Sequence, residues 1–409
     1  MTFSVQHAII LVLALACAAY AAGRVRAVQS ARLANGHLAS LPGYYGWYAA
    51  LWTLIPAIVA GLVGWFVSLP GGLIMVLLPV LAGLGGAYAL SRIRHDQTAQ
   101  AHTERLVRAL LWASGLTAIL ITIGIILSLA FETVSFFASP GVSLLEFFTG
   151  LEWSAQTASA FGAVPLFFGT FFIAFLALLF AAPIGLFSAI YLSEYASPRM
   201  RRIVKPMLEM LAGVPTVVYG FFAILVVSPA VDGLGVAINQ LFHPLTGGED
   251  ILATQPRNAL SAGLVMGIMI VPIISSLSDD VMCAVPTKLR NAALSLGATR
   301  SEMLKHVVLP AAFPGIMAAF LLAVSRAIGE TMIVVMAAGE RANLTLNPFE
   351  DVTTVTVQIV SLLSGDPEFD SPRTLSAFAL GAMLFAITLL CNALAQWVVY
   401  RQRKRYAGL

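Results

Sequence analysis

Long apolar runs separated by short polar segments dominate the chain. Crossing a bilayer as an α-helix takes about 20 consecutive, predominantly apolar residues. The sequence lacks the long alternating patterns of membrane β-barrels. It therefore predicts an all-α integral membrane protein with about nine transmembrane helices, near residues 5–22, 47–67, 71–91, 107–131, 163–193, 207–230, 258–281, 311–338 and 374–400.

Composition agrees with a membrane protein. Of the 409 residues, 59% are hydrophobic and 11% are charged, whereas soluble domains carry about 25% charged residues. The net charge of +3 is too small to suggest a nucleic-acid partner. The three cysteines lie far apart, so they form neither a disulfide framework nor a metal-ligand pattern. We expect no metal and no cofactor.

Lysine and arginine orient the predicted spans. With the N-terminus outside, 19 of the 23 basic residues fall on the inner side, in segments 24–32, 92–108, 199–205, 288–305 and 401–405. This asymmetry is a strong positive-inside signal. The first span resembles a signal peptide at "AYA" (19–21), but the basic residues follow the apolar run instead of preceding it. We expect a retained helix, a periplasmic N-terminus and a cytoplasmic C-terminus.

The chain divides into three parts by composition. Residues 1–91 predict a membrane extension of three helices without intramembrane charge, and residues 92–106 a polar cytoplasmic linker. Residues 107–409 hold the other six spans. The predicted outer loops are acidic, and such a surface does not concentrate a free anion. An anionic substrate would therefore need a carrier.

Two charged residues interrupt the apolar run 311–338. Arg326 falls near the predicted midplane and Glu330 follows four residues later, so on one continuous helix they share a face. A charge in the membrane is costly and usually functional. A guanidinium matches the oxygens of phosphate, and Glu330 would hold it in place. The alternative is an internal ion pair that joins helices.

A second candidate lies in "GVPTVVYG" (213–220), where Pro215 interrupts the helical hydrogen bonds. The polar groups of Thr216 and Tyr219 must then face a cavity or another helix. A substrate contact and a packed kink are both compatible with the sequence.

The long inner loop "VPTKLRNAALSLGATRSEMLKHVVLPAAFPG" (285–315) predicts two short helices around Gly297. Thr299 and Glu302 have the spacing of a capping box at the start of the second helix. An amphipathic element on the inner side suits docking of a partner protein, although an ordinary connection explains it too.

The loop resembles that of importer-type ABC permeases, whose pattern is E-A-A, three residues, G, nine residues, I, one residue, L-P. Here Asn291 replaces the acidic residue and Val307 replaces isoleucine. The spacing is otherwise complete, through Ala292, Ala293, Gly297, Leu309 and Pro310.

Over about residues 107–400 the chain further resembles phosphate permeases of the PstC type. The resemblance is carried by "AIYLSEYAS" (189–197), "EMLAGVPTVVYGFFA" (209–223), "LRNAALSLGATRSEMLKHVVLPAAFPGIMAA" (289–319) and "SRAIGETMIVVMAAG" (325–339). It implies a type I ABC importer permease core, with the type-1 transmembrane domain at about 163–400 and a cytoplasmic coupling loop at 282–310.

The resemblance also implies a function and a set of partners. The function is inward movement of inorganic phosphate across the bacterial inner membrane by alternating access, with Arg326, Glu330, Thr216 and Tyr219 on the path. The partners are a PstA-like permease subunit, a dimer of ATP-binding subunits and a periplasmic phosphate-binding protein. The chain holds no G-x-x-x-x-G-K-[ST] motif, so we expect a transport subunit without its own ATPase site.

Three other functions compete with this interpretation. A permease of the same class could carry phosphonate, molybdate or sulfate. An ion-coupled secondary transporter would use Arg326 and Glu330 as a proton relay, but the loop at 291–310 argues against it. A membrane scaffold or sensor fits only residues 1–91.

The charge pattern makes a testable prediction about topology. A reporter fused after Leu409 should report a cytoplasmic location and one fused before Met1 a periplasmic location, because basic segments remain inside. Finding both ends on one side would exclude an odd number of spans.

Overall fold

The computed structural model describes residues 2–33, 37–67, 70–94, 98–157, 160–246, 252–364 and 371–406. Within these residues, nine helices are long and apolar enough to cross a membrane, which confirms the predicted helical class. The chain forms two compact units, 1–124 and 125–409.

The first unit is built from three tightly packed helices, α1 (Thr2–Leu33), α2 (Pro42–Phe66) and α3 (Gly71–Arg92). Small residues set their spacing. A Cβ on Gly85 would overlap with the carbonyl oxygen of Trp52, and one on Gly46 with Tyr20. Such close approach of backbones is the usual way that membrane helices gain packing contacts.

A single helix, α4 (Ala99–Ala138), begins in the first unit and ends in the second. Residues 99–106, which we placed in a polar linker, are therefore helical. The end of α4 packs in the second unit, where Phe136 is fully buried and the Thr133 hydroxyl lies 3.4 Å from the Phe378 carbonyl.

The second unit contains the remaining elements. They are α5 (Leu144–Thr149), β1 (Trp153–Ser154), η1 (Ala155–Thr157), β2 (Ala160–Phe161), α6 (Val164–Ile190), η2 (Tyr191–Tyr195), α7 (Pro198–Ala212), α8 (Thr216–Phe222), η3 (Ala223–Val227), α9 (Ser228–Thr246), α10 (Ala259–Cys283), α11 (Thr287–Ser295), α12 (Arg300–Met303), η4 (Leu304–Val308), α13 (Leu309–Ile328), α14 (Met332–Ala337), α15 (Val355–Leu363) and α16 (Pro372–Tyr406). Strands β1 and β2 pair antiparallel, with Trp153 opposite Phe161.

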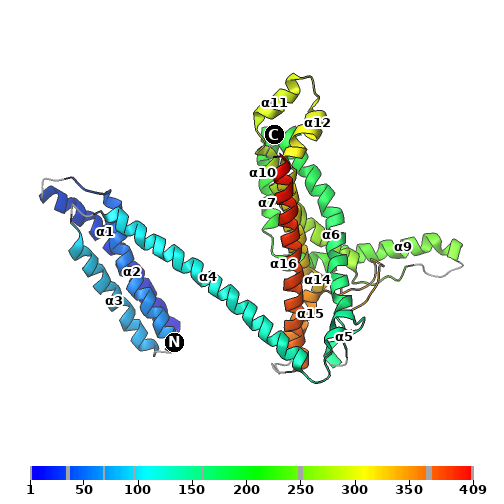
Figure 1. Cartoon of the computed structure of the whole chain (residues 1–409), viewed down its shortest axis with the longest axis horizontal. Helices are drawn as coiled ribbons and strands as arrows, with labels where there is room; N and C mark the ends of the chain where they lie inside the picture. Colours follow the sequence, from blue (N-terminus) through cyan, green and yellow to red (C-terminus); the bar gives the residue numbers. More distant parts are fainter. Residues whose placement is uncertain are drawn as a thin grey trace. The chain divides into compact units, whose positions relative to one another are not determined.

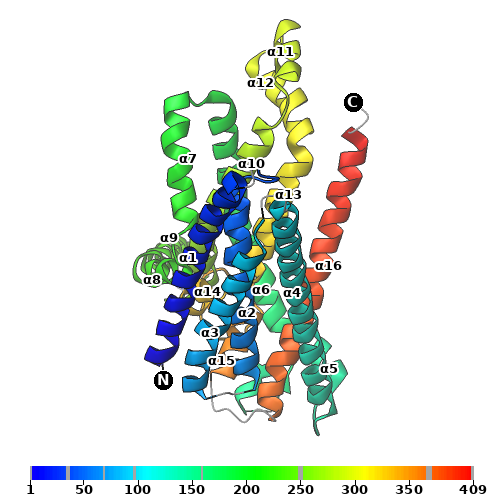
Figure 2. The same cartoon turned by 90° about the vertical axis from the view of Figure 1, so that its left-hand side faces the viewer.

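Helix α10 lies at the centre of the second unit, packed against α6, α7 and α13 (Figures 1 and 2). Its buried residues include Met266, Met269, Ile270 and Ile274. The buried Asn258 side chain caps its first turn by accepting from the Ser261 N–H at 2.8 Å, as expected for an N-cap asparagine.

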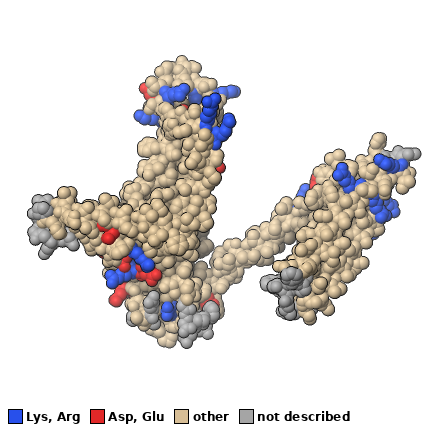
Figure 3. Space-filling view, turned by 180° about the vertical axis from the view of Figure 1, so that it is seen from behind, with Lys and Arg blue, Asp and Glu red and all other residues tan. Residues whose placement is uncertain are grey.

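The two ends of the second unit differ in charge. Helices α11 and α12 project from one end of the second unit (Figures 1 and 2), and lysine and arginine gather over that end (Figure 3). Acidic and basic side chains mix elsewhere on the same face. This is the distribution that the positive-inside pattern predicts for a cytoplasmic end.

Two predicted spans are wrong in their boundaries. The run 207–230 was expected as one helix, but the structure has α7, a break at 213–215, then α8, η3 and α9; α9 runs across the direction of α6 and α10 (Figure 1). The run 311–338 ends as a helix at Ile328, and α14 starts at Met332. Hydropathy averaged over the run places neither break, although Pro215 stands at the first and Gly329 and Glu330 stand at the second.

The close packing of Gly169, which lies on α6, yields a prediction about stability. A side chain at Gly169 would overlap with the carbonyl oxygen of Thr353 and with Val352. Gly169→Leu should therefore destabilise the folded protein by about 1–3 kcal/mol or more, measured as a lower unfolding temperature in detergent. Gly124→Leu is the matched control, because no atom lies within 4 Å of that position; equal effects of the two changes would contradict the packing argument.

Candidate functional site

The inner loop folds as the sequence predicted. Helix α11 ends at Ser295, and Gly297 follows with φ +86°, a backbone conformation that favours glycine. Thr299 and Glu302 then form a complete capping box: the Thr299 hydroxyl accepts from the Glu302 N–H, and the Glu302 carboxylate accepts from the Thr299 N–H at 2.8 Å.

The motif residues of this loop occupy two different surroundings. Asn291 and Ala292 are exposed on α11, while Ala293 packs against the buried cluster around Met303 and Val308. Leu309 and Pro310 are half-buried and form the first turn of α13. The tip of the loop is apolar and exposed, with Leu296 90% exposed, Leu289 48% and Leu294 41%.

Arg326 and Glu330 do not share a helix, which corrects the prediction from their spacing. Helix α13 ends at Ile328, and Glu330 lies in the short segment before α14. Within the described part of the chain, these two side chains form no ion pair with each other. No ion pair among the described residues thus supports the prediction that Glu330 holds Arg326 in place.

Glu330 is bound at the break between the two helices. Its Oε1 accepts from the Met332 N–H at 3.2 Å, and its carbonyl accepts from the Thr356 hydroxyl at 3.0 Å. The carboxylate therefore satisfies an otherwise free N–H at the start of α14. Arg326 is exposed on the last turn of α13, two residues before the end of a helix that is long and apolar enough to cross a membrane.

The sequence left open whether Thr216 and Tyr219 contact a substrate or pack at a kink, and the two residues differ in their contacts. Tyr219 is buried, and its hydroxyl donates to the Leu211 carbonyl at 2.8 Å across the break. This contact favours a packed kink for Tyr219. Thr216 is half-buried at the first position of α8. Helix α8 packs on α14, where Gly220 lies against Met332 and Met336.

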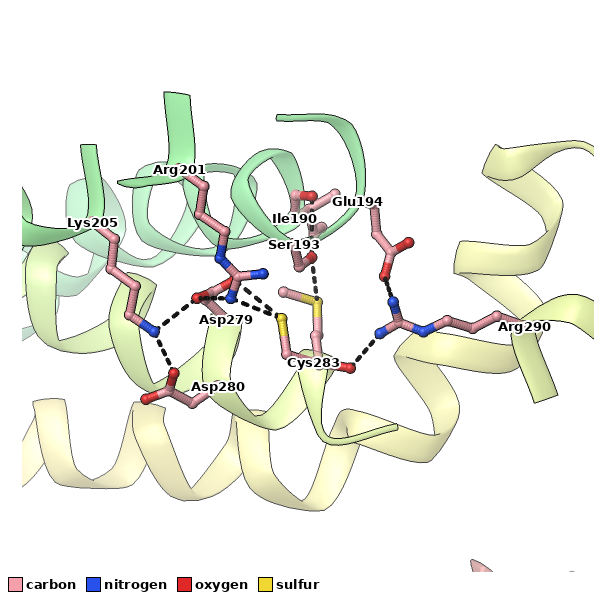
Figure 4. A network of polar contacts seen from close by, with 10 residues as sticks. Ile190, Ser193, Glu194, Arg201, Lys205, Asp279, Asp280, Cys283 and Arg290 are labelled. Carbon is pink, nitrogen blue, oxygen red and sulfur yellow. Dashed lines mark hydrogen bonds and ion pairs between the residues drawn. The ribbon is translucent and has the colours of Figure 1, made fainter. Parts of the chain in front are cut away.

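Sequence reasoning missed a cluster of charges at the inner end of α10. The fully buried carboxylate of Asp279 contacts Arg201 Nη2 at 2.8 Å and Lys205 Nζ at 3.0 Å, and Lys205 also pairs with Asp280 (Figure 4). The available signal was two adjacent acidic residues near the end of the apolar run 258–281. It pointed to no partner, because the cations lie 74 and 78 residues earlier.

The two cations of this cluster are held in their charged forms. Burial lowers the pKa of Lys205, but hydrogen bonds to Asp280 and Asp279 outweigh that effect, so its pKa lies above the ordinary value. The pKa of Arg201 is raised despite burial as well, through its contacts with Cys283 and Asp279. Two positive and two negative charges therefore meet, so the buried carboxylate is compensated.

A second missed ion pair joins α11 to the end of η2. Arg290 Nη1 lies 3.1 Å from Glu194 Oε1, and their side chains are only 16% and 8% exposed (Figure 4). Arg290 also donates to the Met282 carbonyl at 2.6 Å. Both ion-pair groups thus meet at the last turn of α10.

Comparison with known proteins identifies the class of this fold and loop. Residues 181–406 match the family described as "Binding-protein-dependent transport system inner membrane component", and residues 9–75 match one described as "Phosphate ATP-binding cassette transporter". The chain belongs to the family of inner-membrane permease components of binding-protein-dependent ABC transporters. It is thus a multi-pass membrane permease of an ABC transporter.

Two relatives that are at least 30% identical agree with this assignment. The probable ABC transporter permease protein YqgH of Bacillus subtilis is 32% identical over 72% of this chain and 91% of its own length. The phosphate transport system permease protein PstC of Mesorhizobium japonicum is 30% identical over 76% and 96%. Among solved structures, a bacterial ABC transporter that imports the polysaccharide alginate is 18% identical, with a TM-score of 0.46, over 74% of this chain and 99% of that one.

The conformation of Gly297 generates a prediction about assembly. Gly297→Asp places a β-carbon on a residue with φ +86°, at a cost of about 1–2 kcal/mol, and adds a charge to the apolar tip. The altered tip should lower recovery of the ATP-binding subunit in co-purification while the permease still inserts. Ala298→Asp is the neighbouring control, because it adds the same charge at a residue without a left-handed backbone. If Gly297→Asp recovers as much of the ATP-binding subunit as the unaltered chain does, the loop only connects two helices and is not a docking site.

Proposed function

We propose that this chain is a permease subunit that passes inorganic phosphate into the cytoplasm by alternating access, driven by ATP hydrolysis in a separate subunit. The observation that carries the proposal is Arg326, an exposed arginine at the end of α13 among membrane-spanning helices. The printed names of the relatives and of the family matching residues 9–75 refer to phosphate transport.

The position of Arg326 suits an anion path along the surface between two permease subunits. An unpaired guanidinium exposed to lipid is costly, so such residues face a cavity or a partner. Its planar fork offers two parallel hydrogen bonds to phosphate oxygens. Thr216 supplies a hydroxyl from the start of α8, whereas Tyr219 uses its hydroxyl within the chain.

In this proposal Glu330 fixes the point at which α14 begins after the break at 329–331. Its carboxylate caps α14 at the Met332 N–H, which fixes the end of the segment that follows Arg326. It also provides a negative charge near the path, which favours phosphate carrying a proton over an anion that lacks one.

The proposed assembly, at the bacterial inner membrane, contains three kinds of protein partner. A PstA-like permease subunit faces Arg326, a dimer of ATP-binding subunits docks on α11 and the exposed leucines near Gly297, and a periplasmic phosphate-binding protein delivers the substrate. The N-terminus is periplasmic and the C-terminus cytoplasmic. The chain itself hydrolyses no ATP, because its sequence holds no phosphate-binding loop of the G-x-x-x-x-G-K-[ST] type.

Substitutions at Arg326 test the phosphate path. Arg326→Lys keeps the charge and loses the fork, so phosphate uptake at matched membrane levels should fall about tenfold or more. Arg326→Ala should abolish uptake. Arg341→Lys is the matched control, because that arginine is 76% exposed in an outer loop; normal uptake by Arg326→Lys, or a preference of the unaltered complex for sulfate, would overturn the proposal.

Glu330→Gln separates capping from charge. The amide oxygen still accepts from the Met332 N–H, so α14 keeps its cap and the protein should assemble normally. Loss of the charge should lower phosphate uptake and weaken discrimination against sulfate in competition assays. Unchanged uptake and unchanged discrimination would reduce Glu330 to a cap.

A further inference from the structure

Two groups of ion pairs, one around Asp279 and one between Glu194 and Arg290, lie at the end of α10. They join elements that are far apart in the sequence. Arg201 and Lys205 lie four residues apart, on one face of α7, and both hold Asp279 of α10. One turn further along α10, the Cys283 thiol accepts from Arg201 Nη2 at 2.9 Å, and the Met282 carbonyl accepts from Arg290. Contacts at the end of α10 thus connect α7 to the loop helix α11.

The two carboxylates at the centre of these contacts, Asp279 and Glu194, are buried, whereas the cations that hold Asp279 are partly exposed. Asp279 has no exposed surface, and the Glu194 side chain is 8% exposed. Removing one partner of such a pair leaves an uncompensated buried charge, which costs much more than losing a solvent-exposed pair. Rotation or sliding of α7 against α10 would break several of these contacts together.

From α7 the contacts continue to the candidate path. Tyr219 of α8 is bound to Leu211, near the end of α7, across the break at Pro215. Helix α8 is packed against α14 at Gly220, and α14 begins at the N–H that Glu330 caps. A continuous series of packed and hydrogen-bonded groups therefore leads from α11 to the segment after Arg326.

We propose that Glu194, Asp279, Arg201, Lys205 and Arg290 are positioning residues that fix α7 and α8 to the docking helix α11, so that nucleotide-driven movement of α11 moves α8. This inference rests on the proposed function for the identity of the docked ATPase. It assigns no substrate contact to the five residues. It predicts that weakening either ion-pair group uncouples α8 from the nucleotide state without removing the docking surface.

The test measures the movement of α8 directly and uses no phosphate. Val218 of α8 is 54% exposed, and Val218→Cys is introduced into the complex assembled with its permease and ATP-binding partners. The labelling rate of this thiol by a polar maleimide is compared without nucleotide and with ATP plus vanadate, after subtracting the rate of the complex lacking Val218→Cys. A coupled complex should show a change of about fivefold or more.

In that background, Asp279→Asn and Glu194→Gln should reduce the nucleotide-dependent change to near unity while the ATP-binding subunits remain bound. Glu209→Gln is the matched control, because Glu209 is an exposed carboxylate on α7, and it should keep the full change. A purely structural role would instead lower the amount of assembled complex and leave the labelling ratio of the remainder intact.

Asp279→Asn leaves two cations with one carboxylate, so it is the variant most exposed to misfolding. Glu194→Asp covers that case, since it keeps a carboxylate opposite Arg290 and leaves the hydrogen bond from Arg290 to the Met282 carbonyl in place, so it should keep the labelling ratio lost in Glu194→Gln. An intact ratio in Glu194→Gln, a lost ratio in assembled Glu194→Asp, or no nucleotide effect with Val218→Cys alone would each overturn the linkage. Failure of the proposed function appears separately, as absent phosphate uptake by the unaltered complex.

Discussion

Where a helix ends beside an apolar segment, its free backbone N–H and C=O groups must be satisfied by other protein groups, because lipid offers none. In the described part of the second unit such ends occur at 213–215, just before the candidate span Thr216–His243, and at 329–331, just after the candidate span Arg300–Ile328. At the first, the Tyr219 hydroxyl binds the Leu211 carbonyl; at the second, Thr356 binds the Glu330 carbonyl and Glu330 binds the Met332 N–H. The short helices that follow, α8 and α14, then cover each other at Gly220. The arrangement around Arg326 depends on these satisfied breaks.

Features with local causes could be predicted from the sequence. The capping box needs only Thr299 and Glu302 at the right spacing, and a left-handed glycine at 297 needs only a helix end before it. The helical class, with nine apolar helices among the residues that the structure describes, follows from run length and composition. Each of these signals lies within about 20 residues of chain, so no tertiary information is needed to detect it.

Features that depend on distant contacts could not be predicted. The end of α13 at Ile328 falls within the run 311–338, and the break after it is stabilised by the Thr356 hydroxyl and by packing of α14 against α8, which the spacing of Arg326 and Glu330 cannot reveal. Assuming one helix placed these two residues on a common face and suggested a pair that the structure does not contain. Asp279 was overlooked for the same reason, because its cations come from α7.

The two kinds of membrane charge in this chain differ in whether the chain compensates them. The carboxylate of Asp279 is fully buried and has two cations from its own subunit, so its charges are complete before any partner binds. Arg326 is exposed and stands at the end of a helix, with the nearby carboxylate of Glu330 engaged by a backbone N–H instead. A compensated cluster holds elements in register, whereas an uncompensated guanidinium requires something outside the chain to balance it. In the proposed assembly, that balance would fall to the second permease subunit and to the anion on the proposed path.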